Sequence, residues 1–67
     1  MKLGAAIREQ RKTIPMSQEA LADAAGIERS HMGKIERGER NVSFLNIARI
    51  ADALNMPVAS LIASAGL

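Results

Sequence analysis

The chain of 67 residues contains no cysteine, tryptophan or tyrosine, and only one phenylalanine and two prolines. Without cysteine it can form no disulfide bond and no thiolate–metal site, and the single His31 cannot build a metal site alone. No uninterrupted apolar run approaches the roughly 20 residues of a membrane-spanning helix. A chain of this size buries only about 60% of its unfolded surface. We therefore expect one small domain without metal or other cofactor, which a partner subunit would stabilise.

Net charge is also small, because nine basic and seven acidic residues leave only +2 at neutral pH. Four of the nine cationic residues nevertheless lie within twelve positions, at Arg29, Lys34, Arg37 and Arg40. Such a cluster is either a surface that binds a polyanion or an ordinary solvated face. Charged residues at positions 8–12 interrupt the apolar stretch that a signal peptide needs. Together with the missing cysteine, this predicts a cytoplasmic protein.

Apolar residues recur at helical spacing in five stretches, separated by capping and turn residues. They predict helices over residues 3–12, 18–25, 28–36 and 44–54, and a short fifth helix that begins near Pro57. Ser17 and Ser43 are suitable N-caps for the second and fourth helices. Gly26, Gly38 and Asn55 follow helices, where a left-handed residue commonly ends the helix. Since no stretch alternates like a strand, the sequence predicts a compact all-α fold of five helices.

The candidate core follows from the same spacing. Its members are Leu3, Ala6, Ile7, Leu21, Ala22, Ala25, Ile27, Met32, Ile35, Phe44, Ile47, Ile50, Ala51, Leu54, Val58 and Leu61. In the second helix, Ala22 is the small residue at which two crossing helices would come closest. Gly26 then allows a sharp bend of positive φ before the third helix. A helix, a short turn with glycine and a second helix form the layout of a DNA-binding helix-turn-helix.

Four segments in this order carry a resemblance to a known family. They are SQEALADAAGI at 17–27, IERGERN at 35–41, IARIADAL at 47–54 and the apolar turn around Leu61. Over about residues 5–62 the chain resembles the Cro/repressor-type, or XRE, helix-turn-helix proteins. The resemblance implies a five-helix domain whose third helix enters the DNA major groove. The segment NVSFLNI at 41–47 looks most like the stand-alone dimeric regulators, which include the controller proteins of restriction–modification systems.

The sequence departs from the usual family pattern at Thr13-Ile14-Pro15, His31, Gly33 and Pro57. A glycine inside a helix costs about 1 kcal/mol relative to alanine. Gly33 therefore either allows the helix backbone to approach the groove closely or is tolerated without a role. His31 is expected to be a half-buried packing residue, and a phosphate contact is the alternative.

The third helix carries its polar residues opposite the apolar stripe of Met32 and Ile35. These outer residues are Arg29, Ser30, Gly33, Lys34 and Arg37. By resemblance, the base-contacting positions of the family fall on Arg29, Ser30 and Lys34. Arginine and lysine can donate to guanine O6 and N7, whereas a serine hydroxyl discriminates weakly. Alternatively, Arg29 and Lys34 are ordinary solvated charges.

Phosphate contacts are expected on either side of the third helix. The candidates are Gln18, Arg37, Arg40, Asn41 and Ser43. Gln18 begins the second helix, where free N–H groups and its side-chain amide can meet a phosphate. Its alternative role is simply to start the helix. For Ser43, capping is the expected role and phosphate binding the alternative.

An ion pair between Arg11 and Glu36 is a further implication of the resemblance. It would tie the first helix to the end of the third. The alternative is a local pair between Glu36 and Arg40, which at i,i+4 spacing is worth only a few tenths of a kcal/mol.

The last ten residues, 58–67, contain no charged side chain. Val58 and Leu61 suffice to close the core, which leaves Ala59, Ile62, Ala63 and Leu67 without an intramolecular partner. We expect residues 57–67 to dimerise a single domain that spans 1–67, and a frayed terminus is the alternative. The candidate interface of this symmetric homodimer is Leu45, Ala59, Ile62, Ala63 and Leu67.

The sequence thus predicts a transcriptional regulator that binds double-stranded DNA at a roughly palindromic operator as a homodimer. The alternative is an antitoxin whose main partner is a toxin protein, because small antitoxins also use this fold. Antitoxins usually carry an additional segment that engages the toxin. An enzyme is not expected, since no paired carboxylates, nucleophile–base set or metal cluster is visible. Neither a membrane nor a small-molecule ligand is an expected partner.

Overall fold

The computed structural model describes residues 2–39 and 42–66. In this part of the chain it contains five α-helices and no strand, so the all-α prediction is confirmed. The helices are α1 (Lys2–Thr13), α2 (Gln18–Ala25), α3 (Arg29–Glu36), α4 (Phe44–Ala53) and α5 (Val58–Ser64). None of the helices described is long and apolar enough to cross a membrane.

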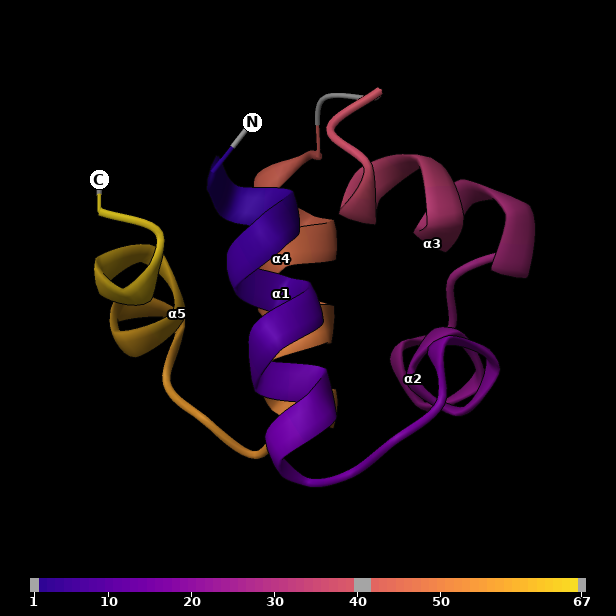
Figure 1. Ribbon diagram of the computed structural model, residues 1–67, viewed down its shortest axis with the longest axis horizontal. Coiled ribbons are helices and arrows are strands. Elements are labelled where there is room, and N and C mark those ends of the chain that lie inside the picture. The colour runs from indigo at the N-terminus through magenta and orange to yellow at the C-terminus, as the bar shows by residue number, and fades with distance from the viewer. Residues whose placement is uncertain (1, 40–41, 67) are drawn as a thin grey trace.

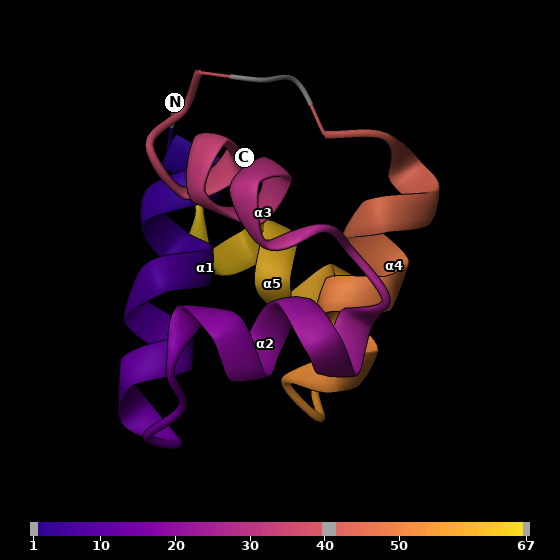
Figure 2. The same cartoon turned by 90° about the vertical axis from the view of Figure 1, so that its right-hand side faces the viewer.

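The five helices pack around one core. Figure 1 shows α1 and α4 in the middle, with α5 on one side and the α2–α3 pair on the other. In Figure 2 the α2–α3 pair faces the viewer between α1 and α4, with α5 behind it. Helix α2 packs on α3 and on α4, while α1 packs on α3 and on α5. The α2–α3 pair is therefore supported from behind by two further helices.

The predicted caps explain where α2 and α4 begin. The Ser17 hydroxyl accepts a hydrogen bond from the backbone N–H of Ala20 at 3.0 Å, and the Ser43 hydroxyl accepts one from Asn46 at 3.1 Å. Each cap satisfies one of the N–H groups that have no partner within the helix. At the end of α2, Gly26 has a φ of 69°, as the bend before α3 requires.

The buried core confirms most of the residues that helical spacing selected. The largest fully buried side chains come from all five helices and are Ile7, Leu21, Met32, Ile35, Ile50 and Leu61. Fully burying one such side chain is worth about 1.5–3 kcal/mol. Ala22 is also fully buried, as expected for the close crossing between helices.

Phe44 was predicted to lie in the core, and this is wrong, because it is 70% exposed. It is the first residue of α4, whereas the buried residues Ile50 and Ala51 lie farther along the helix. Helical periodicity gives the direction of a side chain but not how far the core extends along a helix. The neighbouring Leu45 is 59% exposed, so the start of α4 presents two large apolar side chains.

Candidate nucleic-acid interface

Helix α3 is held by its inner face and leaves its basic residues accessible. Met32 and Ile35 are buried on the inside. On the outside, Arg29 and Ser30 are exposed and Lys34 is half-buried. The helix starts at the turn closed by Gly26, where the Ile27 N–H donates to the Ala22 carbonyl at 2.9 Å.

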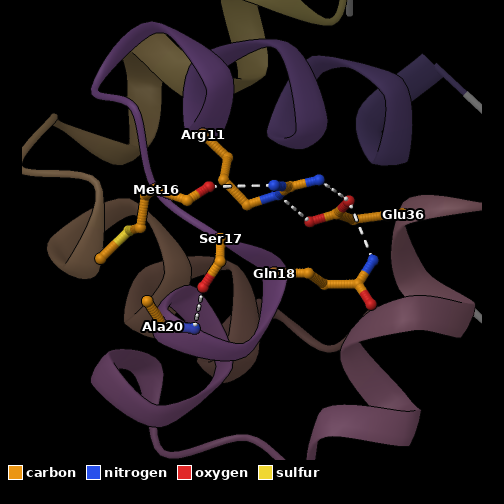
Figure 3. A network of polar contacts seen from close by, with 6 residues as sticks. All are labelled: Arg11, Met16, Ser17, Gln18, Ala20 and Glu36. Carbon is orange, nitrogen blue, oxygen red and sulfur yellow. Dashed lines mark hydrogen bonds and ion pairs between the residues drawn. The ribbon is translucent and has the colours of Figure 1, made fainter.

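The ion pair between Arg11 and Glu36 is present, and it is bidentate (Figure 3). Arg11 Nε donates to Glu36 Oε2 at 2.8 Å, and Nη2 donates to Oε1 at 3.0 Å. The third guanidinium nitrogen, Nη1, donates to the Met16 carbonyl at 2.9 Å. The two side chains are only 13% and 3% exposed, so solvent screens the pair little. The fork geometry fixes α1 against the end of α3.

Gln18 extends this network to α2, which the sequence did not reveal. Its Nε2 donates to Glu36 Oε1 at 3.2 Å (Figure 3). Glu36 therefore receives hydrogen bonds from two helices, α1 and α2, while it belongs to a third. The orientation of the Gln18 amide is set by α3 and not only by the start of its own helix.

Arg29 forms ion pairs across the helix-turn-helix. Its Nη2 lies 3.0 Å from Asp23 Oδ2, and its Nη1 lies 3.3 Å from Glu19 Oε2. The hydrogen bond to Asp23, and then the charges of Asp23 and Glu19, raise the pKa of Arg29. All three side chains are more than half exposed, so solvent screens these pairs and they hold Arg29 only weakly. Sequence spacing alone does not show this contact, because it depends on the angle between α2 and α3.

Arg37 and Ser30 also have partners close by in the chain. Arg37 Nε donates to Glu39 Oε2 at 2.6 Å, and the Ser30 hydroxyl donates to Glu28 Oε1. The hydrogen bond from Arg37 lowers the pKa of Glu39, and the same bond raises the pKa of Arg37. Both residues of this pair remain charged at neutral pH, and both are exposed.

Gly33 lies on the same stripe of α3 as the exposed Arg29 and Arg37, as predicted, but it is itself buried. A Cβ at this position would lie 3.2 Å from Arg37 Nη1 and 3.3 Å from Gln18 Oε1. The missing side chain thus leaves room for two of the predicted phosphate contacts. His31 is half-buried as expected and lines a hollow of about 340 Å³ with Asn46 and Arg49 of α4.

The remaining predicted residues fall into three groups. Ser43 acts as the cap of α4 and is exposed at the start of that helix. Among the candidate interface residues, Leu45, Ala59 and Ala63 are exposed and Ile62 is half-buried. The other candidates lie outside the described residues and are Arg40, Asn41 and Leu67.

Gly4 places α3, a role that no pattern in the sequence revealed. A Cβ on Gly4 would collide with the backbone carbonyl oxygen of Ile35 and lie 2.9 Å from that of Glu36. Helix α1 therefore approaches the last turn of α3 more closely than any residue with a side chain allows. A glycine early in a predicted helix was the only signal, and its partner lies in another part of the sequence.

Comparison with known proteins agrees with this arrangement. The helix-turn-helix family matches residues 7–61. Control protein C.SmaI of Serratia marcescens is 39% identical over 61 residues, which are 91% of this chain and 73% of the relative. The crystal structure of the restriction-modification controller protein C.AhdI from Aeromonas hydrophila is 45% identical, with a TM-score of 0.87 over 90% of this chain and 91% of that chain. The biofilm regulator SinR, solved in complex with DNA, is 30% identical, with a TM-score of 0.84 over 90% and 97%. The chain therefore belongs to the Cro/repressor-type helix-turn-helix family.

Proposed function

We propose that the protein is a transcriptional regulator that binds a specific double-stranded DNA sequence with α3 in the major groove. The observation that carries the proposal is that α3 is buried on one side and exposes polar side chains on the other. Its inner side is fixed by Met32, Ile35 and the Arg11–Glu36 pair. Its outer side presents Arg29, Ser30 and Lys34, whose donors match the acceptors of base edges. The controller proteins among its relatives suggest that it regulates a restriction–modification system.

Phosphate contacts would fix α3 in the groove. Gln18 lies at the start of α2, where helix N–H groups favour an anion. Arg37 is exposed at the end of α3. These two side chains meet above Gly33, so one strand of the DNA backbone can contact both. Arg40, Asn41 and Ser43 are proposed to contact the backbone beyond them.

We further propose a symmetric homodimer. The described part of α5 leaves Ala59 and Ala63 exposed and Ile62 half-buried, and Leu45 adds apolar surface at the start of α4. Residues 57–67, with Leu67 at their end, would form most of the interface. A two-fold axis places two recognition helices about 34 Å apart, which is one turn of DNA, and so requires a roughly palindromic site.

Selection of binding sites from random duplex DNA tests the regulator. We expect a palindromic site to be enriched. With that site, Arg29→Ala should weaken binding about ten- to a hundredfold and relax the preference at one base of each half-site. Equal weakening on all sequences would make Arg29 a phosphate contact. A pool without enrichment would contradict specific binding and favour a protein partner.

Sedimentation at micromolar concentration tests the dimer. The wild type should sediment as a dimer, and Ile62→Asp should sediment as a monomer because a carboxylate cannot be buried unpaired. Ser60→Asp is the matched control, since it adds the same charge to an exposed position of α5 outside the proposed interface. A dimer that tolerates Ile62→Asp, or a monomeric wild type, would disprove the interface.

A further inference from the structure

A basic hollow lies among α1, α2 and α3, apart from the exposed first turn of α3. It has a volume of about 320 Å³. Its lining consists of Arg8, Arg11, Gln18, Glu36 and Arg37. We infer that this hollow binds one phosphate of the DNA backbone and that Arg8 is a phosphate contact. This inference rests on the proposed function, because it takes duplex DNA as the partner.

The charges of the lining favour an anion. Three guanidinium groups face one carboxylate, and that carboxylate is already neutralised by the bidentate pair with Arg11. The two remaining charges belong to Arg8 and Arg37. Within residues 2–39 and 42–66, no carboxylate pairs with Arg8, and Arg37 pairs only with the exposed Glu39. Guanidinium groups donate in a planar fork that fits phosphate oxygens.

The polar groups of the hollow are held in place before any ligand binds. Glu36 accepts one hydrogen bond from the Gln18 amide, and the second N–H of that Nε2 remains to donate to a phosphate. Gln18 is also the first residue of α2, where the helix dipole favours negative charge. Because Glu36 is itself fixed by Arg11, the position of the amide depends on all three helices.

Gly33 keeps the hollow open. The ends of the Gln18 and Arg37 side chains both lie over its backbone, because a Cβ on Gly33 would be 3.3 Å from Gln18 Oε1 and 3.2 Å from Arg37 Nη1. A glycine in the middle of α3 is thus explained by the space that these two side-chain ends need. The sequence does not reveal this position of Arg8, because only the fold brings α1 beside Gln18 and Arg37.

The salt dependence of DNA binding tests the role of Arg8. With the selected operator, Arg8→Ala should lower the slope of log K against log salt by about one unit. It should weaken the operator and a scrambled duplex by the same factor. Arg49→Ala, which removes an exposed arginine outside this hollow, should leave the slope unchanged. An unchanged slope for Arg8→Ala, in a variant whose circular dichroism matches the wild type, would overturn the inference.

Single methylphosphonate substitutions in the operator identify the phosphate. At one position of each half-site, removing the phosphate charge should weaken DNA binding by the wild type. The same change should not weaken DNA binding by Arg8→Ala any further. Additive effects at every position would show that Arg8 touches no phosphate. Replacing chloride by inorganic phosphate at constant ionic strength should not change the wild-type affinity. Inhibition by phosphate that Arg8→Ala abolishes, together with additive methylphosphonate effects at every position, would assign the hollow to a free anion instead.

The proposed function and the inference fail separately. If selection enriches no site, specific regulation is contradicted, while the salt slope on mixed-sequence duplex still tests Arg8. If an operator is enriched and Arg8→Ala leaves its slope unchanged, the regulator stands and the hollow is not a phosphate site.

Discussion

Two buried glycines, Gly4 in α1 and Gly33 in α3, occupy helix interiors for different physical reasons. At Gly4 the space of the missing side chain is taken by backbone carbonyl groups of α3. At Gly33 it is taken by the ends of the Gln18 and Arg37 side chains. A backbone carbonyl cannot move without its helix, whereas a long side chain rotates at little cost. Gly4 therefore sets the distance between two helices, and Gly33 sets the shape of a surface.

Glu36 connects these two positions, and removing its carboxylate should have the largest effect on stability. Glu36→Ala leaves the Arg11 guanidinium without its partner in a site that is only 13% exposed. Breaking one side of a buried pair costs about 3–5 kcal/mol, which approaches the total stability of so small a domain. Urea denaturation measures this loss.

Glu39→Ala is the matched control for this prediction, because it removes the exposed carboxylate that pairs with Arg37. We expect it to change the urea midpoint very little. If the two variants lost similar stability, the Arg11–Glu36 pair would not anchor α3 to α1. The contrast between a rigid site at Gly4 and an adaptable one at Gly33 would then lose its basis.

The second prediction adds a methyl group to the tighter of the two glycine sites. Gly4→Ala should destabilise the fold by about 1–3 kcal/mol, because α1 must move away from the last turn of α3. This sign opposes the intrinsic preference of helices for alanine. Denaturant unfolding measures the change. Ala5→Gly, at the exposed neighbouring position, reports the preference alone and should cost about 1 kcal/mol. A Gly4→Ala variant more stable than the wild type would refute the close approach.

Local signals explain how much of the fold could be predicted. Ser17, Ser43 and Gly26 act on neighbouring backbone groups, so the sequence contains all that is needed to place the helix ends. The role of Gly4 and the exposure of Phe44 depend on where another helix lies, and no local pattern encodes that.

The candidate site was predictable to a different extent. The outward position of Arg29 and Ser30 follows from helical periodicity, and the structure agrees. The pair between Arg11 and Glu36 came from family resemblance and is present, although residue spacing alone could not give it. The link from Gln18 to Glu36 and the place of Arg8 in the hollow require three helices to be assembled. The base contacts themselves stay predictions.

The smallest effect on stability is expected at the other glycine. Gly33→Ala places a Cβ against two flexible side-chain ends, which can move by a few tenths of an ångström. Since alanine favours a helix interior, the free energy of unfolding should either exceed that of the wild type or lie within about 1 kcal/mol of it. DNA affinity should nevertheless fall a few-fold on operator and scrambled duplex alike, because Gln18 and Arg37 are displaced from the hollow. Thermal unfolding and binding titrations of one preparation measure both quantities.

If Gly33→Ala were as destabilising as Gly4→Ala, the side-chain ends could not move aside, and the two glycines would not differ. If it were more stable and bound DNA as tightly as the wild type, the space above Gly33 would have no part in phosphate binding.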